Sequence, residues 1–229
     1  MKTLGVDTST SVNTVAICDG DRVIAETAVD CGRAHAERLM ATVDWVLSEA
    51  GLRLPQLDLL AVSIGPGSFT GLRIGVSAWK GLAMASGLPL VGVPTLDAMT
   101  RLGVFNDAVV CPILDAKMRE VFGAIYRYSN GVREKLTKER VAPVESFCEE
   151  APPGTIFYGD GTMAYGGAIL AKRPDVRVLN GALGSPRASA VCAEGAEIAA
   201  RGLAGGPESV TPVYLRMSQP EVLRAQAAP

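Results

Sequence analysis

Apolar and polar positions divide the chain into short strands and amphipathic helices, and the most regular stretch covers residues 59–87. A short apolar run over residues 59–64, with Ser63 as its one polar residue, predicts a strand that is covered on both faces. A glycine-rich turn ends this strand, and Ser68 or Thr70 can cap a helix that begins near Gly71. The remaining elements are arranged around this strand, turn and helix.

The residues before and after this unit predict a mixed sheet covered by helices. Apolar or alternating residues bounded by turn signals predict strands over residues 3–8, 12–18, 22–29 and 89–93. Apolar residues at helical spacing, or a capping residue before an apolar run, predict helices over residues 34–50 and 96–102. An antiparallel meander followed by alternating strands and helices is typical of a sheet with both parallel and antiparallel strands.

The same order of elements then starts again. Each half opens with a strand, an aspartate turn, a long strand, a glycine hairpin and a returning strand, and Asp7 and Asp115 lie in equivalent turns. We interpret this as an internal duplication that leaves a ligand-binding cleft between the two aspartate turns. The strands predicted for the second half cover residues 109–114, 120–128, 132–141, 155–158 and 177–179. The helices cover residues 145–150, 163–170 and 189–201, and an extended segment covers residues 212–216.

The predicted fold class is therefore α/β with two lobes, each a mixed five-stranded sheet flanked by helices. The first lobe covers residues 1–102 and the second covers residues 103–216. The last helix of the second lobe is a candidate to pack back on the first lobe, and residues 217–229 form a tail that we expect to be flexible.

The helix after the glycine-rich turn has one face with little bulk. The residues of this face recur at spacings of four and three, and all but Leu82 are small: Gly71, Gly75, Ala78, Leu82 and Ala85. Because small side chains allow another helix to approach closely, this face is a candidate for helix packing. Trp79 lies off the small stripe and is a candidate anchor for a partner.

Two turns carry groups that bind anions in other proteins. A glycine-rich turn at a helix start offers free N–H groups to a phosphate, although the usual lysine and the dinucleotide glycine spacing are both absent. Asp7, with Thr8 and Ser9, can hold a phosphate or a metal-bound water, or can simply form a turn by bonding to its own backbone. The residues alone leave both interpretations open.

Composition restricts the function classes. The net charge of -2 and the pI of about 5.5 argue against a dedicated nucleic-acid surface. The five cysteines lack metal-type spacing, and we see neither a signal peptide nor a long apolar run, so we expect a reducing, cytoplasmic location. His35 is the only histidine, and a site that needs two imidazoles cannot form within this chain.

Together these features resemble the TsaB (YeaZ) family of bacterial tRNA threonylcarbamoyladenosine (t6A) synthesis. The resemblance implies a two-lobed actin-like ATPase (ASKHA, ribonuclease H-like) fold. It covers nearly the whole chain, and its most specific motif, GPGSFTGLRIG over residues 65–75, is shared with the catalytic paralogue TsaD. The other matching segments are Asp7-Thr8-Ser9, Arg33, residues 35–39, Asp115-Ala116, residues 120–122 and residues 212–216.

The chain departs from the TsaD pattern at several positions, so it resembles TsaB, the non-catalytic subunit, rather than TsaD. TsaD carries a metal on two histidines four residues apart, whereas Leu39 stands four residues after His35. The second turn, Asp115-Ala116-Lys117, lacks the double glycine of a phosphate loop. The resemblance therefore implies no catalytic residue, no metal and no cofactor. It leaves a vestigial cleft whose candidate residues are Asp7, Thr8, Ser9 and Asp115.

The resemblance also implies partners. A TsaB-type subunit pairs with TsaD through two helices of its first lobe in a four-helix bundle, helps to recruit the P-loop ATPase TsaE, and meets tRNA through the complex. It is required for threonylcarbamoyl transfer to adenosine 37 of tRNAs that read ANN codons. The predicted contact residues are His35, Leu39, Val43, Val46, Leu72, Gly75, Val76, Ala78, Trp79 and Leu82. The alternatives are a nucleotide-dependent enzyme or peptidase of the same fold, and a regulatory homodimer that uses the same helices on itself.

Overall fold

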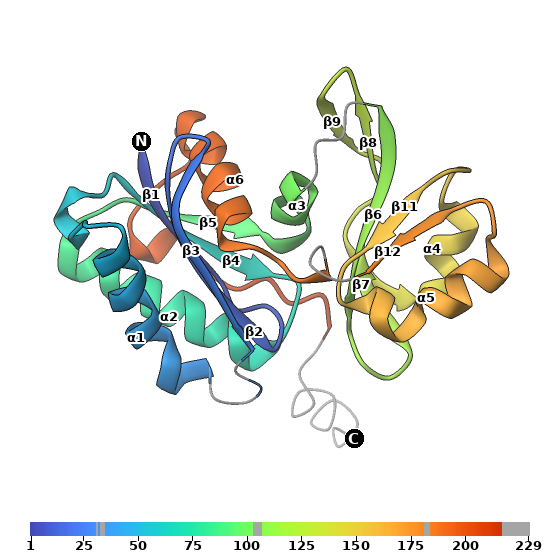
Figure 1. The fold of residues 1–229 in the computed structure, drawn as a ribbon, viewed down its shortest axis with the longest axis horizontal. Coiled ribbons are helices and arrows are strands. Elements are labelled where there is room, and N and C mark those ends of the chain that lie inside the picture. Colours follow the sequence, from blue (N-terminus) through green and yellow to red (C-terminus); the bar gives the residue numbers. More distant parts are fainter. Residues whose placement is uncertain (31, 33–34, 103–106, 181–183, 217–229) are drawn as a thin grey trace, which may run out of the picture.

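The computed structural model describes residues 1–30, 32, 35–102, 107–180 and 184–216. Figure 1 shows two α/β halves side by side, each built on a twisted sheet with helices on its faces. Arg33 and the predicted tail, residues 217–229, lie outside the described residues. None of the helices in the described ranges combines the length and apolar character that crossing a membrane requires.

The first half contains a five-stranded sheet in the order β3-β2-β1-β4-β5, in which β1 is antiparallel to β2 and parallel to β4. Its strands are β1 (Lys2–Asp7), β2 (Val12–Asp19), β3 (Arg22–Asp30), β4 (Leu59–Gly65) and β5 (Leu90–Pro94). Its helices are α1 (His35–Glu49), α2 (Phe69–Ser86) and α3 (Thr95–Met99), with 3₁₀ turns at Leu54–Gln56 and Thr100–Leu102. Every element predicted for this half is present, with the predicted helix 96–102 divided between α3 and the second 3₁₀ turn.

The second half repeats this arrangement. Its strand order, β10-β7-β6-β11-β12, has the same pattern of antiparallel and parallel pairs as the first sheet, which confirms the internal duplication at the level of topology. The strands are β6 (Ala108–Asp115), β7 (Glu120–Gly123), β8 (Tyr126–Ser129), β9 (Val132–Lys135), β10 (Arg140–Pro143), β11 (Ile156–Tyr158) and β12 (Arg177–Leu179). The helices are α4 (Val144–Glu150) and α5 (Gly161–Lys172).

The second sheet has seven strands rather than the five predicted, because the predicted strands 120–128 and 132–141 are each divided in two. β6 pairs with β7 through its C-terminal part and with β8 through its N-terminal part. At the break, the N–H of Ile125 donates to the hydroxyl of Thr137 at 2.9 Å, and its carbonyl accepts from Leu136 at 2.8 Å. These bonds satisfy the backbone where the pairing of β6 with β7 stops, and β8 and β9 continue as a hairpin on the N-terminal part of β6.

The last helix, α6 (Ala188–Ala200), packs on the sheet of the first half, and a 3₁₀ turn at Pro207–Ser209 follows it. Close approach requires glycine on both sides, since a side chain at Gly5 of β1 or Gly195 of α6 would overlap the opposite element. Arg187 occupies the N-cap position of this helix, which begins one residue before the predicted start at Ser189. The N–H and hydroxyl of Ser189 donate to Glu26 of β3, at 3.0 and 2.9 Å.

The helices α1 and α2 cover the other face of the first sheet and pack with its strands to form the core of this half (Figure 1). The indole N–H of Trp79 donates to the carbonyl oxygen of Leu4 at 3.2 Å, which anchors α2 to β1. Six of the predicted partner contacts are at most 3% exposed: Leu39, Val43, Val46, Leu72, Val76 and Trp79. Their assignment as contact residues is wrong, because these side chains fill the core of this chain.

The remaining predicted contacts lie at the edge of that core or outside the described side chains. Ala78 and Leu82 are half-buried against the core. Gly75 faces Thr8, and a methyl group added to Gly75 would overlap the side chain of Thr8. Its assignment as a partner contact is therefore wrong as well. The side chain of His35 lies outside the described residues.

The helix α2 lies directly against the turn between β1 and β2. The hydroxyl of Thr8 donates to the carbonyl oxygen of Gly71 at 2.8 Å. A methyl group on Gly71 would overlap the carbonyl oxygen of Thr8. The glycines at the start of α2 are thus explained by packing within the chain.

We expect Gly71→Ala to destabilise the chain by about 1–3 kcal/mol, because the new methyl group forces α2 away from the backbone of Thr8. In Gly81→Ala the added carbon meets open space, and alanine favours a helix interior by roughly 0.5–1 kcal/mol. Urea unfolding of both variants measures the two changes in free energy. Equal stability of the two variants would contradict this packing.

Candidate functional site

The two aspartate turns end equivalent strands, since Asp7 closes β1 and Asp115 closes β6. Asp7 is 1% exposed, and its carboxylate accepts hydrogen bonds from the N–H and hydroxyl of Ser9, at 2.9 and 2.7 Å. It also accepts one from the hydroxyl of Ser63 on β4. We had not predicted Ser63, although it is the only polar residue in the apolar run of residues 59–64.

The glycine-rich turn between β4 and α2 is held by the first aspartate turn. The N–H of Ser68 donates to the carbonyl oxygen of Ser9 at 2.7 Å, and the N–H of Gly71 donates to the hydroxyl of Ser68, its helix cap, at 3.2 Å. A side chain on Gly67 would overlap Ser9. The N–H groups of Ser68 and Gly71 are therefore engaged within the chain, which favours the structural interpretation of this turn over phosphate binding.

The second aspartate turn is built from charges rather than hydroxyls. Asp115 accepts a hydrogen bond from the N–H of Lys117 at 2.8 Å and pairs with its ammonium group at 2.6 Å. The N–H of Asp115 donates at 2.9 Å to Asp160, which precedes α5. Burial, together with the nearby charge of Asp115, raises the pKa of Asp160 from 3.8 to about 6. The carboxylate of Asp160 thus accepts the hydrogen bond from the N–H of Asp115, a donor that a phosphate oxygen would need.

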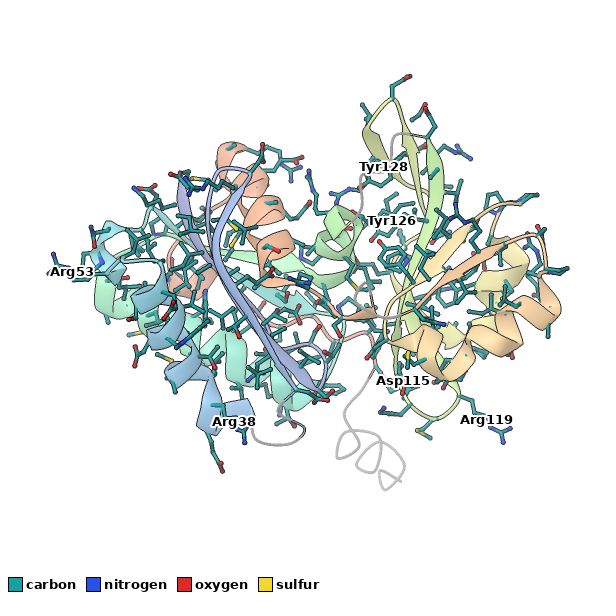
Figure 2. The ribbon with its side chains drawn as sticks, in the orientation of Figure 1. Arg38, Arg53, Asp115, Arg119, Tyr126 and Tyr128 are labelled. Carbon is teal, nitrogen blue, oxygen red and sulfur yellow. The ribbon has the colours of Figure 1, made fainter. Side chains whose placement is uncertain are left out.

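The residues after Asp115 adopt an unusual backbone. Lys117, Met118 and Arg119 have φ angles of 61°, 54° and 64°, a left-handed conformation that is costly for residues other than glycine. Figure 2 shows Arg119 extending away from the body of the protein. A groove of about 530 Å³ lies beside the turn and is lined by Met118, Arg119, Glu120, Pro143, Val144, Glu145 and Tyr165.

The polar side chains that line this groove are Arg119, Glu120, Glu145 and Tyr165. Its lining contains no histidine, cysteine, serine or threonine that could act as a nucleophile or as its base. Glu120 is ion-paired with Arg216. Within the described ranges, no group of three or more acidic, histidine or cysteine side chains is placed to hold a metal ion.

The extended segment of residues 212–216, called the strap below, begins on the first half. The N–H of Val213 donates to the carbonyl oxygen of Ile64 at 2.7 Å. The ring of Tyr214 stacks on Phe69, with centroids 4.4 Å apart, and its hydroxyl accepts a hydrogen bond from Arg73 at 2.9 Å. These contacts fix the strap to the end of β4 and the first turn of α2.

The strap then reaches the second aspartate turn. Arg216 donates to the carbonyl oxygen of Ala116 at 3.0 Å and forms the ion pair with Glu120. The sequence predicted an extended segment here, but it gave no sign that the segment connects the two halves. Its partners are distant in the chain, 100 residues away in the case of Ala116.

The outer faces of α1 and α2 are open to solvent. A methyl group on Gly81 would meet nothing within 4 Å, and Met84 is 75% exposed. On α1, Met40 and Trp45 are 42% and 51% exposed. We had not predicted this surface, although a second small stripe at a spacing of four residues marks it: Ser77, Gly81 and Ala85.

Comparisons with known proteins agree on one family. The model of the family described as "TsaD: tRNA N6-adenosine threonylcarbamoyltransferase" matches residues 28–206. The chain is 30% identical to the tRNA threonylcarbamoyladenosine biosynthesis protein TsaB of Bacillus subtilis, over 96% of each chain. It is 33% identical to the protein of the same name from Escherichia coli, over 94% of this chain and 95% of the relative.

The fold agrees as well. The structure of YeaZ from Pseudomonas aeruginosa matches with a TM-score of 0.78 and 29% identity, over 93% of this chain and 99% of that one. With the strand order repeated in both halves, this similarity confirms the predicted α/β actin-like ATPase fold. The chain belongs to the TsaB (YeaZ) family.

Proposed function

We propose that this chain is a non-catalytic subunit of the complex that forms threonylcarbamoyladenosine in tRNA. In this role it pairs with a TsaD-type catalytic protein, helps to recruit a TsaE-type ATPase, and meets tRNA through the complex. The proposal is supported by the similarity, over nearly the full length, to relatives named for tRNA threonylcarbamoyladenosine biosynthesis.

The observation that carries the non-catalytic role is that groups of the chain itself occupy both aspartate turns. A phosphate binds where N–H groups and a helix N terminus are available. In the first turn, the N–H groups of Ser68 and Gly71 are bonded to Ser9 and Ser68. In the second, the N–H of Asp115 is bonded to Asp160, whose negative charge at neutral pH repels a phosphate. These contacts support a docking subunit over a nucleotide-dependent enzyme.

We assign the partner surface to the outer faces of α1 and α2. Small residues at Ser77, Gly81 and Ala85 allow a helix to approach closely, as helix bundles require. Trp45 and Met84 supply exposed apolar area beside them, and aromatic side chains are common anchors at interfaces. This proposed surface lies on the two helices that the sequence predicted, α1 and α2, but its contact residues are on their solvent-facing sides.

Gly81→Leu is expected to weaken pairing with a TsaD-type protein about tenfold or more, because leucine fills space that a partner helix needs, at a cost of about 1–3 kcal/mol. The variant should keep the stability of the isolated chain, since the added carbon meets open space. Light scattering after size-exclusion chromatography gives the mass of the complex. The yield of modified nucleoside, with and without this chain, tests the function.

Gly167→Leu is the matched control. Gly167 is also an exposed glycine within a helix, α5, and a carbon added there meets nothing within 4 Å. This variant should pair and support tRNA modification like the unaltered chain. If both leucine variants pair equally well, the surface is misassigned. If the chain stays a homodimer when the TsaD-type protein is added, or modification proceeds equally without it, the proposed function is wrong.

Asp160→Asn is expected to change how stability depends on pH. Because the pKa of Asp160 is raised to about 6, the stability that its proton contributes is fully present below about pH 4 and is lost as the pH rises through 6. Asparagine keeps an oxygen for the N–H of Asp115 but does not ionise. The free energy of unfolding of the variant, relative to the unaltered chain, should therefore rise between about pH 4 and pH 7.

Urea unfolding at a series of pH values measures this effect. Asp44→Asn, which removes a carboxylate from an exposed position on α1, is the control for the loss of one negative charge. Parallel profiles for Asp160→Asn and the unaltered chain would show that the Asp160 carboxylate is not held as described.

A further inference from the structure

The hairpin β8–β9 is the part of the second sheet that has no counterpart among the described strands of the first sheet. In Figure 1 it rises from the second half and lies beside α3, which packs on α6 and on β4 of the first half. Figure 2 shows Tyr126 and Tyr128 on this hairpin, next to α3. The extra hairpin therefore lies at the boundary between the two halves.

Tyrosine hydroxyls from the second half bond to α3 and to the 3₁₀ turn that follows it. Tyr126, which is fully buried, donates to the carboxylate of Asp97 at 2.7 Å. Tyr128 donates to the carbonyl oxygen of Thr100 at 3.0 Å. Lys135 of β9 also pairs with Asp97, at 2.8 Å. The hairpin thus holds both a side chain and the backbone of the first half.

Arg133 of β9 makes the most extensive of these contacts. Its guanidinium donates two hydrogen bonds to Glu194 of α6, at 2.7 and 3.0 Å, in the two-pronged geometry that makes arginine–carboxylate pairs strong. It also donates to the carbonyl oxygen of Asp97 and to the hydroxyl of Thr100, each at 2.9 Å. One side chain of the second half therefore joins two helical elements of the first.

Glu194 is the buried end of this ionic contact. It is 1% exposed and is also paired with Arg101, at 2.7 Å. Burial by itself raises the pKa of Glu194, but the hydrogen bonds and charges of Arg133 and Arg101 hold it below its usual value. Moving the halves apart would leave this carboxylate buried with fewer partners, which is strongly unfavourable.

The strap provides a second connection. It is bonded to Ile64 and Phe69 on the first half, and through Arg216 to Ala116 and Glu120 on the second. In Figure 1 the hairpin meets α3 at the upper end of the boundary, and the segment that leads to the C terminus crosses at the lower end. Two connections at separate points resist a rotation that either one alone would permit.

We propose that hairpin β8–β9 and the strap are latches that fix the two halves at one angle. Many two-lobed proteins close around a ligand by a hinge motion, for which the lobes must be free to rotate. In this chain the latches replace the hinge, and α1 and α2 are held rigidly relative to the second half. The inference concerns the isolated chain and does not depend on the proposed function.

Pulsed electron–electron double resonance tests the inference on the full chain. Spin labels at Ser48→Cys on α1 and Ala168→Cys on α5 report the distance between the halves, since both positions are exposed. The described cysteines are buried, and Cys31→Ser removes the remaining one. We expect a single narrow distance distribution that magnesium and ATP leave unchanged, and a broader or shifted distribution in Arg133→Ala.

Arg127→Ala is the matched control, because Arg127 lies on the same hairpin but pairs with Glu134 within it. It should keep the narrow distribution. Tyr214→Ala, at a partly exposed position in the strap, should broaden the distribution and serves if Arg133→Ala does not fold. A broad distribution in the unaltered chain, or an unchanged one in the folded latch variants, would overturn the proposal.

Discussion

The packing of the β1–β2 turn against α2 is the contact on which the first half depends. Thr8 fits there because Gly71 and Gly75 carry no side chain, and the N–H of Ser68 completes the contact by donating to Ser9. The same contact takes up space and hydrogen-bond donors that a phosphate would need at the start of a helix. One contact therefore stabilises this half and, under the proposed function, also accounts for a turn that does not bind phosphate.

The second half reaches the same result with different groups. The strand order is repeated, yet the carboxylate of Asp160 takes the place of the packed hydroxyls, and Lys117 neutralises Asp115. The N–H of Ala116 donates to the carbonyl oxygen of Glu120 at 3.0 Å, and the N–H of Glu120 donates to that of Lys117 at 3.1 Å, which holds the left-handed backbone of this turn. A shared ligand would require both turns to stay alike. Under the proposed docking role, which needs no shared ligand, each turn has only to satisfy its own buried polar groups, so the two can diverge.

The sequence predicted the types and order of the elements and the duplication, because periodicity and turn residues act within a single element. It could not orient α2, since Gly75 and Gly81 are equally small and the position of Thr8 decides which one is covered. The candidate aspartate turns were located correctly, but their partners Ser63 and Asp160 come from other strands and loops. Likewise, Arg133 and Glu194 lie 61 residues apart, and no local pattern marks such a pair.

The internal hydrogen bonds of the two aspartate turns and the proposed fixed angle between the halves are physically connected. Hinge closure requires two arrangements of similar free energy, from which a bound ligand selects one. When the chain itself satisfies the polar groups of each turn, closing around a ligand forms no additional hydrogen bonds. Ligand binding then gives no free energy to a second arrangement, and the contacts between the halves favour a single angle. The buried pair of Glu194 and Arg133 then specifies that angle, because another angle would separate buried charges. A body that is already rigid also loses the least conformational entropy when its outer helices dock.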